Sequence, residues 1–264
     1  MTSSLFASWR GEGEEIAVLL HGFGAGHGVW NGVASALSGT ARTLAYDLPG
    51  HGASLAVPDA GSPRKAAQAI AADMAAHNLL RVHLVGHSMG GAIAMLTALA
   101  APERVASLTL LAPGGVGPEI AAGLLRRYAR AADPAELAAC LAAMSGPGAT
   151  TPADTIEILL AMRRQPGQVD KLAEIAASIT RDDRQGAIPA ALLASLAMPV
   201  TVLWGMGDPV LPASQAQSLP DRFVVQRLAR AGHMLIEEAA RPSAARRADI
   251  DRGCIPVGSV LTLP

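Results

Sequence analysis

The chain has 264 residues, of which 50% are hydrophobic and 16% charged, and its formal net charge is −1 at pH 7. This length is sufficient for one large hydrophobic core. The balanced charge, without a basic stripe, excludes a nucleic-acid-binding protein, and no apolar run reaches the ~20 residues of a membrane span.

The cellular location is predicted from the N-terminus and the cysteines. Residues 1–10 lack the basic and apolar regions of a signal peptide. The two cysteines, Cys140 and Cys254, fit neither a disulfide framework nor a zinc site. We therefore expect a cytoplasmic protein without metal or cofactor that binds neither nucleic acid nor membrane. Whether it forms a homo-oligomer stays open.

The first predicted strand, residues 16–20, runs into a glycine-rich loop at residues 21–28. The loop contains no G-x-G-x-x-G in register, which disfavours a dinucleotide site. The segment before residue 16 is short, so the presence of an earlier edge strand stays open. Strand and helix patterns alternate over residues 5–112 and predict a parallel sheet.

A G-x-S-x-G motif stands at residues 86–90, between a buried strand at 82–85 and a buried helix at 92–100. This is the pattern of a nucleophile elbow, a tight turn that exposes its serine, here Ser88. The two glycines let the strand and the helix pass closely, and the helix N-terminus favours developing negative charge. The alternative is a glycine-rich turn that contains a serine by chance, but the flanking strand and helix argue against it.

From residue 116 to 195 the strand patterns stop, and four segments have helical apolar spacing. They are residues 119–131, 134–144, 152–164 and 169–180. Because this insertion stands between strands, we expect a helical cap over Ser88 rather than helices on the outer face. We therefore divide the chain into a core of residues 1–115 and 196–264 and a cap insertion of residues 116–195. The cap is rich in Ala, Leu, Ile and Met, so its pocket should suit small or aliphatic acyl groups.

A serine nucleophile needs a base and an acid that orients the base, in the chain order Ser, Asp or Glu, His. Asp208 follows a predicted strand at 199–205, and His233 follows another at 222–228. Both lie at the strand ends where open α/β sheets place ligands. The loop at 113–117 carries no carboxylate, which removes the other plausible position. Glu237 and Glu238 are weaker rivals because they come after the histidine.

The chain has seven histidines, and only His233 follows both the serine and the acid. His87 neighbours the nucleophile and is expected to pack or hydrogen-bond locally. His27 and His51 lie in glycine-rich loops at the same sheet edge and are candidates for the pocket wall. Structural or surface roles are expected for the rest: His21, His77 and His83.

These elements in this order resemble an α/β-hydrolase-fold protein over nearly the whole chain. The resemblance implies a mostly parallel twisted sheet with helices on both faces and a helical cap. Residues 46–54 match a family loop in which Asp47 is structural rather than catalytic. A closing C-terminal helix is expected, but the sequence after about Ile250 breaks helical spacing.

A narrower similarity is to the hydrolase-like domain of acetoin dehydrogenase dihydrolipoyl acetyltransferase. It rests on residues 110–120, 208–213 and 231–234. The only two lysines, Lys65 and Lys171, do not lie between strand patterns as a lipoylated lysine would. In such a complex any lipoyl group would therefore come from another chain.

The sequence thus predicts a serine-dependent hydrolase of a small-molecule carboxylic ester that works through an acyl-enzyme. The proposed triad is Ser88, His233 and Asp208, and the N–H groups of Phe23 and Met89 are the proposed oxyanion donors. The candidate pocket residues are Gly22, Gly24, His87, Leu125 and Met162. Three alternatives stay open: acyl transfer in an acetoin dehydrogenase-type complex, carbon–carbon bond hydrolysis of a vinylogous diketone, and a non-catalytic small-molecule binding protein.

Overall fold

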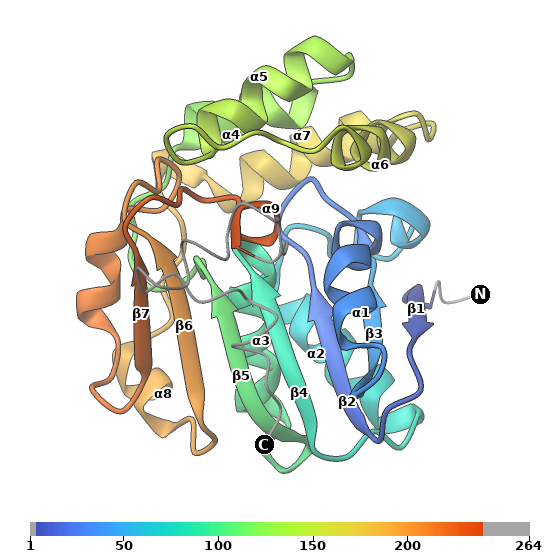
Figure 1. Cartoon of the computed structure of the whole chain (residues 1–264), viewed down its shortest axis with the longest axis vertical. Coiled ribbons are helices and arrows are strands. Elements are labelled where there is room, and N and C mark those ends of the chain that lie inside the picture. Colours follow the sequence, from blue (N-terminus) through green and yellow to red (C-terminus); the bar gives the residue numbers. More distant parts are fainter. Residues whose placement is uncertain (1–3, 240–264) are drawn as a thin grey trace.

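Seven strands form one sheet in the order β1-β3-β2-β4-β5-β6-β7 in the computed structural model, which describes residues 4–239 (Figure 1). Their bounds are Ala7–Arg10 (β1), Glu15–Leu20 (β2), Ala41–Tyr46 (β3), Val82–His87 (β4), Val105–Leu111 (β5), Val200–Gly205 (β6) and Val224–Leu228 (β7). The neighbouring pairs from β3 to β7 are all parallel. The predicted mostly parallel sheet is confirmed.

The edge strand that the sequence left open is present. Strand β1 pairs antiparallel with β3, with Ala7 opposite Tyr46. The N–H group of Asp47 also donates to the carbonyl of Phe6, which extends this pairing toward the site. Four residues are enough for the strand because an edge strand needs a partner on only one side.

Helices cover both faces of the sheet, which is why its central strands are mostly buried on both sides. All six residues of β4 are buried. Helix α1 lies in front of the sheet in Figure 1, and α2, α3 and α8 lie behind it. Their bounds are Asn31–Leu37 (α1), Pro63–Ala76 (α2), Met89–Ala100 (α3) and Ala190–Ser195 (α8), and a last helix, α9, spans Leu235–Ala239. Short 3-10 turns occur at His27–Trp30, Gly52–Ser54, Pro102–Arg104, Arg181–Asp183 and Ala213–Ser218.

Four further helices lie across the carboxyl ends of the strands (Figure 1). They are α4 (Ala122–Arg130), α5 (Pro134–Met144), α6 (Ala153–Arg163) and α7 (Gln168–Ile179). Helix α5 begins where the sequence predicts because Asp133 caps it, accepting from the N–H groups of Ala135 and Glu136, and Pro134 occupies the first turn.

The predicted start of α4 at residue 119 is three residues early. Glu119 forms an isolated bridge with Arg184, and its carbonyl accepts a hydrogen bond from Gln215. These contacts hold the segment extended until Ala122. Helix α8, which belongs to the predicted insertion, contacts α3 behind the sheet instead of lying over the site. The division into core and cap remains a prediction.

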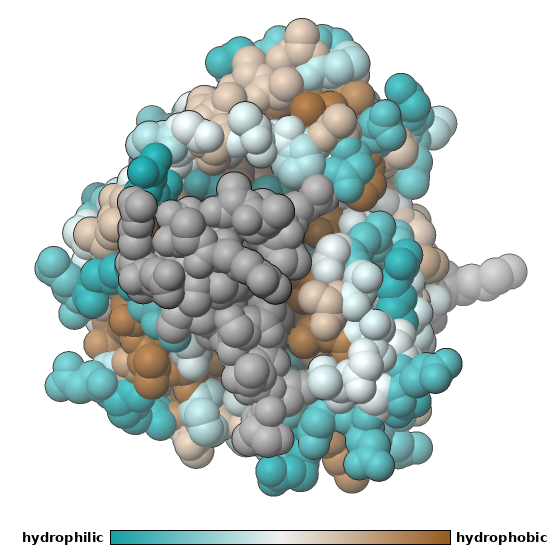
Figure 2. Space-filling view, in the orientation of Figure 1, coloured by the Kyte–Doolittle hydropathy of each residue, from teal (hydrophilic) through white to brown (hydrophobic). Residues whose placement is uncertain are grey.

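Apolar side chains also reach the surface. In Figure 2 they gather over the edge strand β7, where Val224 is 58% exposed. Val224 begins β7, so it lies at the end of the sheet opposite the site that follows Leu228. Among residues 4–239 no helix is long and apolar enough to cross a membrane. The question of the closing helix after Ile250 falls outside the described residues.

Candidate active site

Ser88 occupies a strained turn between β4 and α3, with φ 53° and ψ −117°. Two glycines make the turn possible: a Cβ on Gly90 would lie 2.2 Å from the carbonyl oxygen of Leu20, and one on Gly86 would lie 2.4 Å from that of Gly90. The N–H group of Ser88 donates to the carbonyl of Leu111 at the end of β5 (2.9 Å). Such strain persists only where the surroundings enforce it, and it is common at functional sites.

The structure brings Ser88, His233 and Asp208 into one hydrogen-bonded chain. The Ser88 Oγ lies 2.9 Å from Nε2 of His233, and the His233 Nδ1 lies 2.9 Å from Oδ2 of Asp208. His233 and Asp208 are 3% and 8% exposed. A carboxylate on Nδ1 fixes the tautomer in which Nδ1 carries the proton and Nε2 can accept the serine proton.

The turn after β6 holds Asp208 firmly. Its Oδ1 accepts hydrogen bonds from the N–H groups of Val210 and Leu211, both at 2.8 Å. Oδ2 is thereby directed at His233. The carboxylate is therefore fixed in orientation although it is buried, because hydrogen bonds satisfy both of its oxygens.

The loop of His233 is held by its own backbone. The His233 N–H donates to the carbonyl of Met144, at the end of α5, and the His233 carbonyl accepts from Nε2–H of His87, both at 2.8 Å. Burial lowers the pKa of His87 to about 3, and the neighbouring His233 acts in the same direction. His87 is therefore neutral and acts here as a hydrogen-bond donor that fixes the loop.

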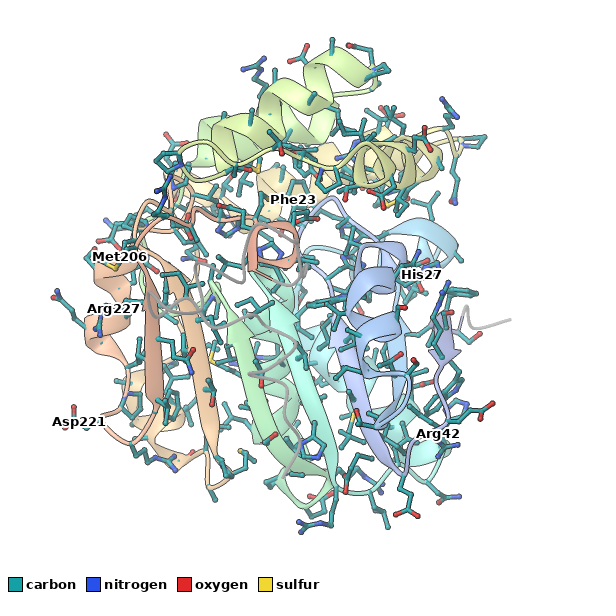
Figure 3. The ribbon with its side chains drawn as sticks, in the orientation of Figure 1. Phe23, His27, Arg42, Met206, Asp221 and Arg227 are labelled. Carbon is teal, nitrogen blue, oxygen red and sulfur yellow. The ribbon has the colours of Figure 1, made fainter. Side chains whose placement is uncertain are left out.

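The proposed oxyanion donors stand beside Ser88. A Cβ on Gly22 would lie 3.3 Å from Cβ of Ser88, so the loop before Phe23 passes directly next to the serine. Figure 3 shows Phe23 between the top of the sheet and the helical layer. Within residues 4–239 the N–H groups of Phe23 and Met89 have no hydrogen-bond acceptor. Both N–H groups are thus free to bind a developing oxyanion.

Histidine rings hold the glycine-rich loop in place through hydrogen bonds. Gly24 donates its N–H to Nε2 of His51 (3.1 Å), and Leu48 donates to Nε2 of His21 (3.0 Å). Burial lowers the pKa of both rings, that of His51 to about 3, so both remain neutral acceptors. His27 binds Asp47 through its Nδ1. Neither His27 nor His51, the two candidates for the pocket wall, lines either of the two cavities that contain Ser88.

Asp47 has a structural position, as expected from the resemblance. Its Oδ1 accepts from the N–H and Nδ1 of His27 (2.7 and 2.8 Å), and its Oδ2 accepts from the N–H of Ala53 (2.9 Å). Burial acts to raise the pKa of Asp47, but the hydrogen bonds from His27 and from the N–H of Ala53 outweigh it and lower the pKa. The carboxylate thus joins two loops at the sheet edge.

Two cap residues that the sequence analysis missed hold the same loop. Nη1 of Arg163 donates to the carbonyl of Gly24 at 2.9 Å, and the Tyr128 hydroxyl donates to it at 3.2 Å. The Arg163 guanidinium lies 4.6 Å from the centre of the Tyr128 ring and is almost fully buried. A helical arginine usually points to solvent, and no local pattern distinguished this one from its exposed neighbour Arg164.

Two cavities meet at Ser88. The larger, about 320 Å³, has mainly apolar walls that include Leu96, Ile120, Ile179, Ile188, Leu192 and Leu211. The smaller, about 30 Å³, is bounded by Val29, Tyr128, Met144, Leu159, His233 and Ile236. Phe23, Ser88 and Leu125 line both cavities.

The predicted pocket residues divide into two groups. Gly22 and His87 line the smaller cavity, and Leu125 lines both. Gly24 and Met162 line neither. Gly24 faces Tyr128, whose ring would be 2.4 Å from an added Cβ, and the Met162 sulfur approaches Gly26, on the other side of the loop. Among the described residues no cluster of three or more His, Cys, Asp or Glu could hold a metal ion.

Comparison with known proteins agrees with this geometry. The model of the alpha/beta hydrolase family matches residues 17–246. The chain is 35% identical over 230 residues to the dihydrolipoyllysine-residue acetyltransferase component of the acetoin cleaving system of Pseudomonas putida, which covers 87% of this chain and 61% of that protein. It is 32% identical over 240 residues to the pimeloyl-[acyl-carrier protein] methyl ester esterase of Chromobacterium violaceum, covering 84% of this chain and 89% of that enzyme.

A solved structure shares the fold. The meta-cleavage product hydrolase of Pseudomonas fluorescens superposes with a TM-score of 0.78 at 20% identity, over 97% of this chain and 92% of that one. The two resemblances that the sequence suggested, to the hydrolase fold and to the acetoin-system acetyltransferase, are both confirmed. The chain spans only 61% of the length of the acetyltransferase from Pseudomonas putida and 62% of that from Cupriavidus necator.

Proposed function

Because this chain belongs to the alpha/beta hydrolase family, we propose that it is a serine hydrolase that cleaves a small-molecule carboxylic ester through an acyl-enzyme. One observation carries the proposal: the continuous hydrogen-bonded chain from Ser88 through His233 to Asp208. The free N–H groups of Phe23 and Met89 beside this chain support it.

In the proposed acylation step, Oγ of Ser88 attacks the ester carbonyl carbon while Nε2 of His233 takes the serine proton. The carbonyl oxygen becomes an oxyanion and accepts hydrogen bonds from Phe23 and Met89, each worth about 3 kcal/mol in such sites. Asp208 stabilises the imidazolium. The bond from carbon to the alcohol oxygen then breaks, and His233 returns its proton to that oxygen.

In the proposed deacylation step, His233 takes a proton from a water molecule, whose oxygen attacks the acyl carbon. The tetrahedral species collapses, the bond to Ser88 Oγ breaks, and the proton returns to the serine. The free acid leaves. His87 supports both steps by holding the backbone of His233. Because the His87 ring is neutral, it also adds no positive charge beside the imidazolium.

The nucleophile is tested with a fluorophosphonate probe, which labels an activated serine covalently. We expect labelling of the wild-type protein and none of the Ser88→Ala variant. Ser178→Ala is the matched control, because Ser178 also lines the larger cavity but its hydroxyl donates to the carbonyl of Gly61 instead of a histidine. Equal labelling of wild type and Ser88→Ala, or no labelling of either, would reject the proposed nucleophile and favour a binding protein with an idle triad.

The reaction is tested with a panel of substrates. Turnover of simple esters with release of acid supports the proposal. Two other reactions are included. Acetyl transfer, which one relative carries in its name, is tested with an acetyl thioester and a thiol acceptor. Carbon–carbon cleavage, which the sequence analysis left open, is tested with a vinylogous diketone. A higher kcat/KM for either of these than for every ester would replace ester hydrolysis by that reaction.

A further inference from the structure

The two cavities that meet at Ser88 differ about tenfold in size. The larger, about 320 Å³, falls at the lower end of the range for small-molecule sites. The smaller, about 30 Å³, has room for about two water-sized groups. An ester bound with its carbonyl carbon at Ser88 must place one substituent in each cavity. Its two halves must therefore differ greatly in size.

The position of His233 decides which cavity holds the alcohol of the ester and which holds the acyl chain. The protonated Nε2 must reach the oxygen of the leaving alcohol, so the alcohol lies on the histidine side of the serine. His233 lines the smaller cavity and does not line the larger. The leaving alcohol is accordingly the small half, and the acyl chain occupies the larger cavity.

The side chains that line the larger cavity indicate what kind of acyl chain it binds. Leu96, Ile179 and Ile188 are aliphatic, and Phe23 is the one aromatic side chain among its described lining residues. Such walls suit an extended methylene chain rather than a flat ring. Of the small or aliphatic acyl groups that the sequence analysis expects, the volume allows an aliphatic chain of some length.

The rim of the larger cavity carries a positive charge. Arg64, in the first turn of α2, is the one charged side chain among the described lining residues, and it is exposed. Within residues 4–239 no carboxylate pairs with Arg64, whereas the adjacent Lys65 is 3.7 Å from Asp59. The described residues of the walls include no acid that would repel an anion.

On the basis of the proposed function, we infer that the substrate is an ester between a small alcohol, methanol or ethanol in size, and an extended aliphatic acid with an anionic group at its far end. The small cavity beside His233 sets the size of the alcohol. Arg64 selects the charge at the other end of the acyl chain.

The size of the alcohol is tested with methyl, ethyl, butyl and benzyl octanoate. We expect kcat/KM for the butyl ester to be about tenfold or more below that for the methyl ester, because extra methylenes overfill a packed pocket. Leu159→Ala and the milder Val29→Ala enlarge the small cavity and should raise the relative rate of the butyl ester. Since this is a gain of activity, a misfolded variant cannot imitate it. Equal rates for all four esters would overturn the inference.

The charge at the far end is tested with monomethyl adipate, suberate and sebacate against methyl hexanoate, octanoate and decanoate. We expect wild type to prefer the charged member of the best pair by about fivefold, the value of a good exposed ion pair. Arg64→Ala should remove this preference through KM, Arg64→Lys should retain part of it, and Lys65→Ala should leave it unchanged. Preference for the neutral ester, or an undiminished preference in Arg64→Ala, would overturn this part.

Fluorophosphonate labelling separates failure of the inference from failure of the proposed function. If Ser88 is labelled and esters are cleaved without the expected order of size and charge, the inference is wrong and the serine hydrolase stands. If Ser88 is not labelled and no ester is cleaved, the proposed function fails, and the inference fails with it.

Discussion

Ser88, Asp208 and His233 all follow the carboxyl ends of sheet strands, whereas several contacts that hold their loops come from the helices above them. The sheet residues contribute the atoms that would react. The cap helices contribute carbonyl acceptors and buried donors, such as the Met144 carbonyl on His233 N–H and the Arg163 guanidinium on Gly24. The strand ends therefore contribute the reacting groups, and the helices above them hold the loops that carry these groups.

Several of the cap contacts with the core loops are polar and reach backbone atoms. Gln168, at the start of α7, accepts from the N–H of Gly52 and donates to the carbonyl of Gly50 (2.8 and 2.9 Å). On the other side, the Glu238 carboxylate of the core accepts from the N–H of Gly146, in the loop after α5. Such contacts fix position more than they add stability, because hydrogen bonds are directional while their net contribution is only about 1 kcal/mol each.

We therefore expect the loss of activity to depend on the region that is substituted. A substitution in the sheet-borne triad removes a chemical step, while a substitution in a cap contact displaces a loop by a fraction of an ångström. Substitutions and a change of pH test this difference between the sheet and the helices above it.

Asp208→Asn should lower kcat about 10⁴-fold with little change in thermal stability, because an amide at this position favours the wrong tautomer of His233. Steady-state kinetics on the best methyl ester measures the loss. Asp221→Asn is the control, since Asp221 is exposed and lies far from Phe23 in Figure 3. A loss under tenfold would mean that another acid orients the histidine.

The free energy of unfolding should fall as the pH falls below about 6.5, and the cause lies in the core. Residues 116–195 contain no histidine, whereas burial lowers the pKa of His21, His51 and His87 in the core, the last two to about 3. The unfolded chain binds protons at these rings near the ordinary value of ~6.5, so their contribution is complete above that pH and is lost as the pH falls toward 3.

Chemical denaturation at several pH values between 7 and 4.5 measures this dependence. His51→Gln should reduce its slope by up to about 1.4 kcal/mol per pH unit, the value for one proton. An unchanged slope in this variant would show that His51 is not held neutral in the folded protein.

Arg163→Met should lower kcat about 10²-fold while KM changes little, because the Gly24 carbonyl loses its strongest donor and the Phe23 N–H shifts from its position. Arg163→Lys should recover part of the rate. Arg164→Met is the matched control on the same helix, since Arg164 is exposed. Equal rates for Arg163→Met and Arg164→Met would show that the cap does not position the oxyanion loop.

Glu238→Gln should have the smallest effect, about a fivefold loss in kcat. Its carboxylate accepts from the N–H groups of Gly146 (3.0 Å), Gly232 (2.9 Å) and Met234 (3.1 Å), and so joins the cap to the loop of His233. An amide can satisfy only part of this set, because its NH₂ group faces donors. Glu157→Gln, on the exposed side of α6, is the control. If both variants keep full activity, the contact is structural only.

Much of the fold and the triad could be predicted because the signals are local. Apolar runs mark the strands, and parallel strands end at one edge, so a residue just after a strand must lie near residues after its neighbours. The order of Ser88, Asp208 and His233 along the chain then identified which side chains meet. Helix α5 was predicted with its observed bounds because Asp133 and Pro134 are themselves start signals.

The sequence alone therefore determined the architecture and the three side chains that the sheet edge brings together. The tertiary structure alone decided which histidines hold loops, that Arg163 and Tyr128 reach Gly24, and that the cavities on either side of Ser88 differ tenfold in volume. The physical reason is the range of the interactions. Strand ends and helix caps depend on neighbours within a few residues, whereas these contacts join residues from 20 to 146 positions apart and depend on how separate segments pack together.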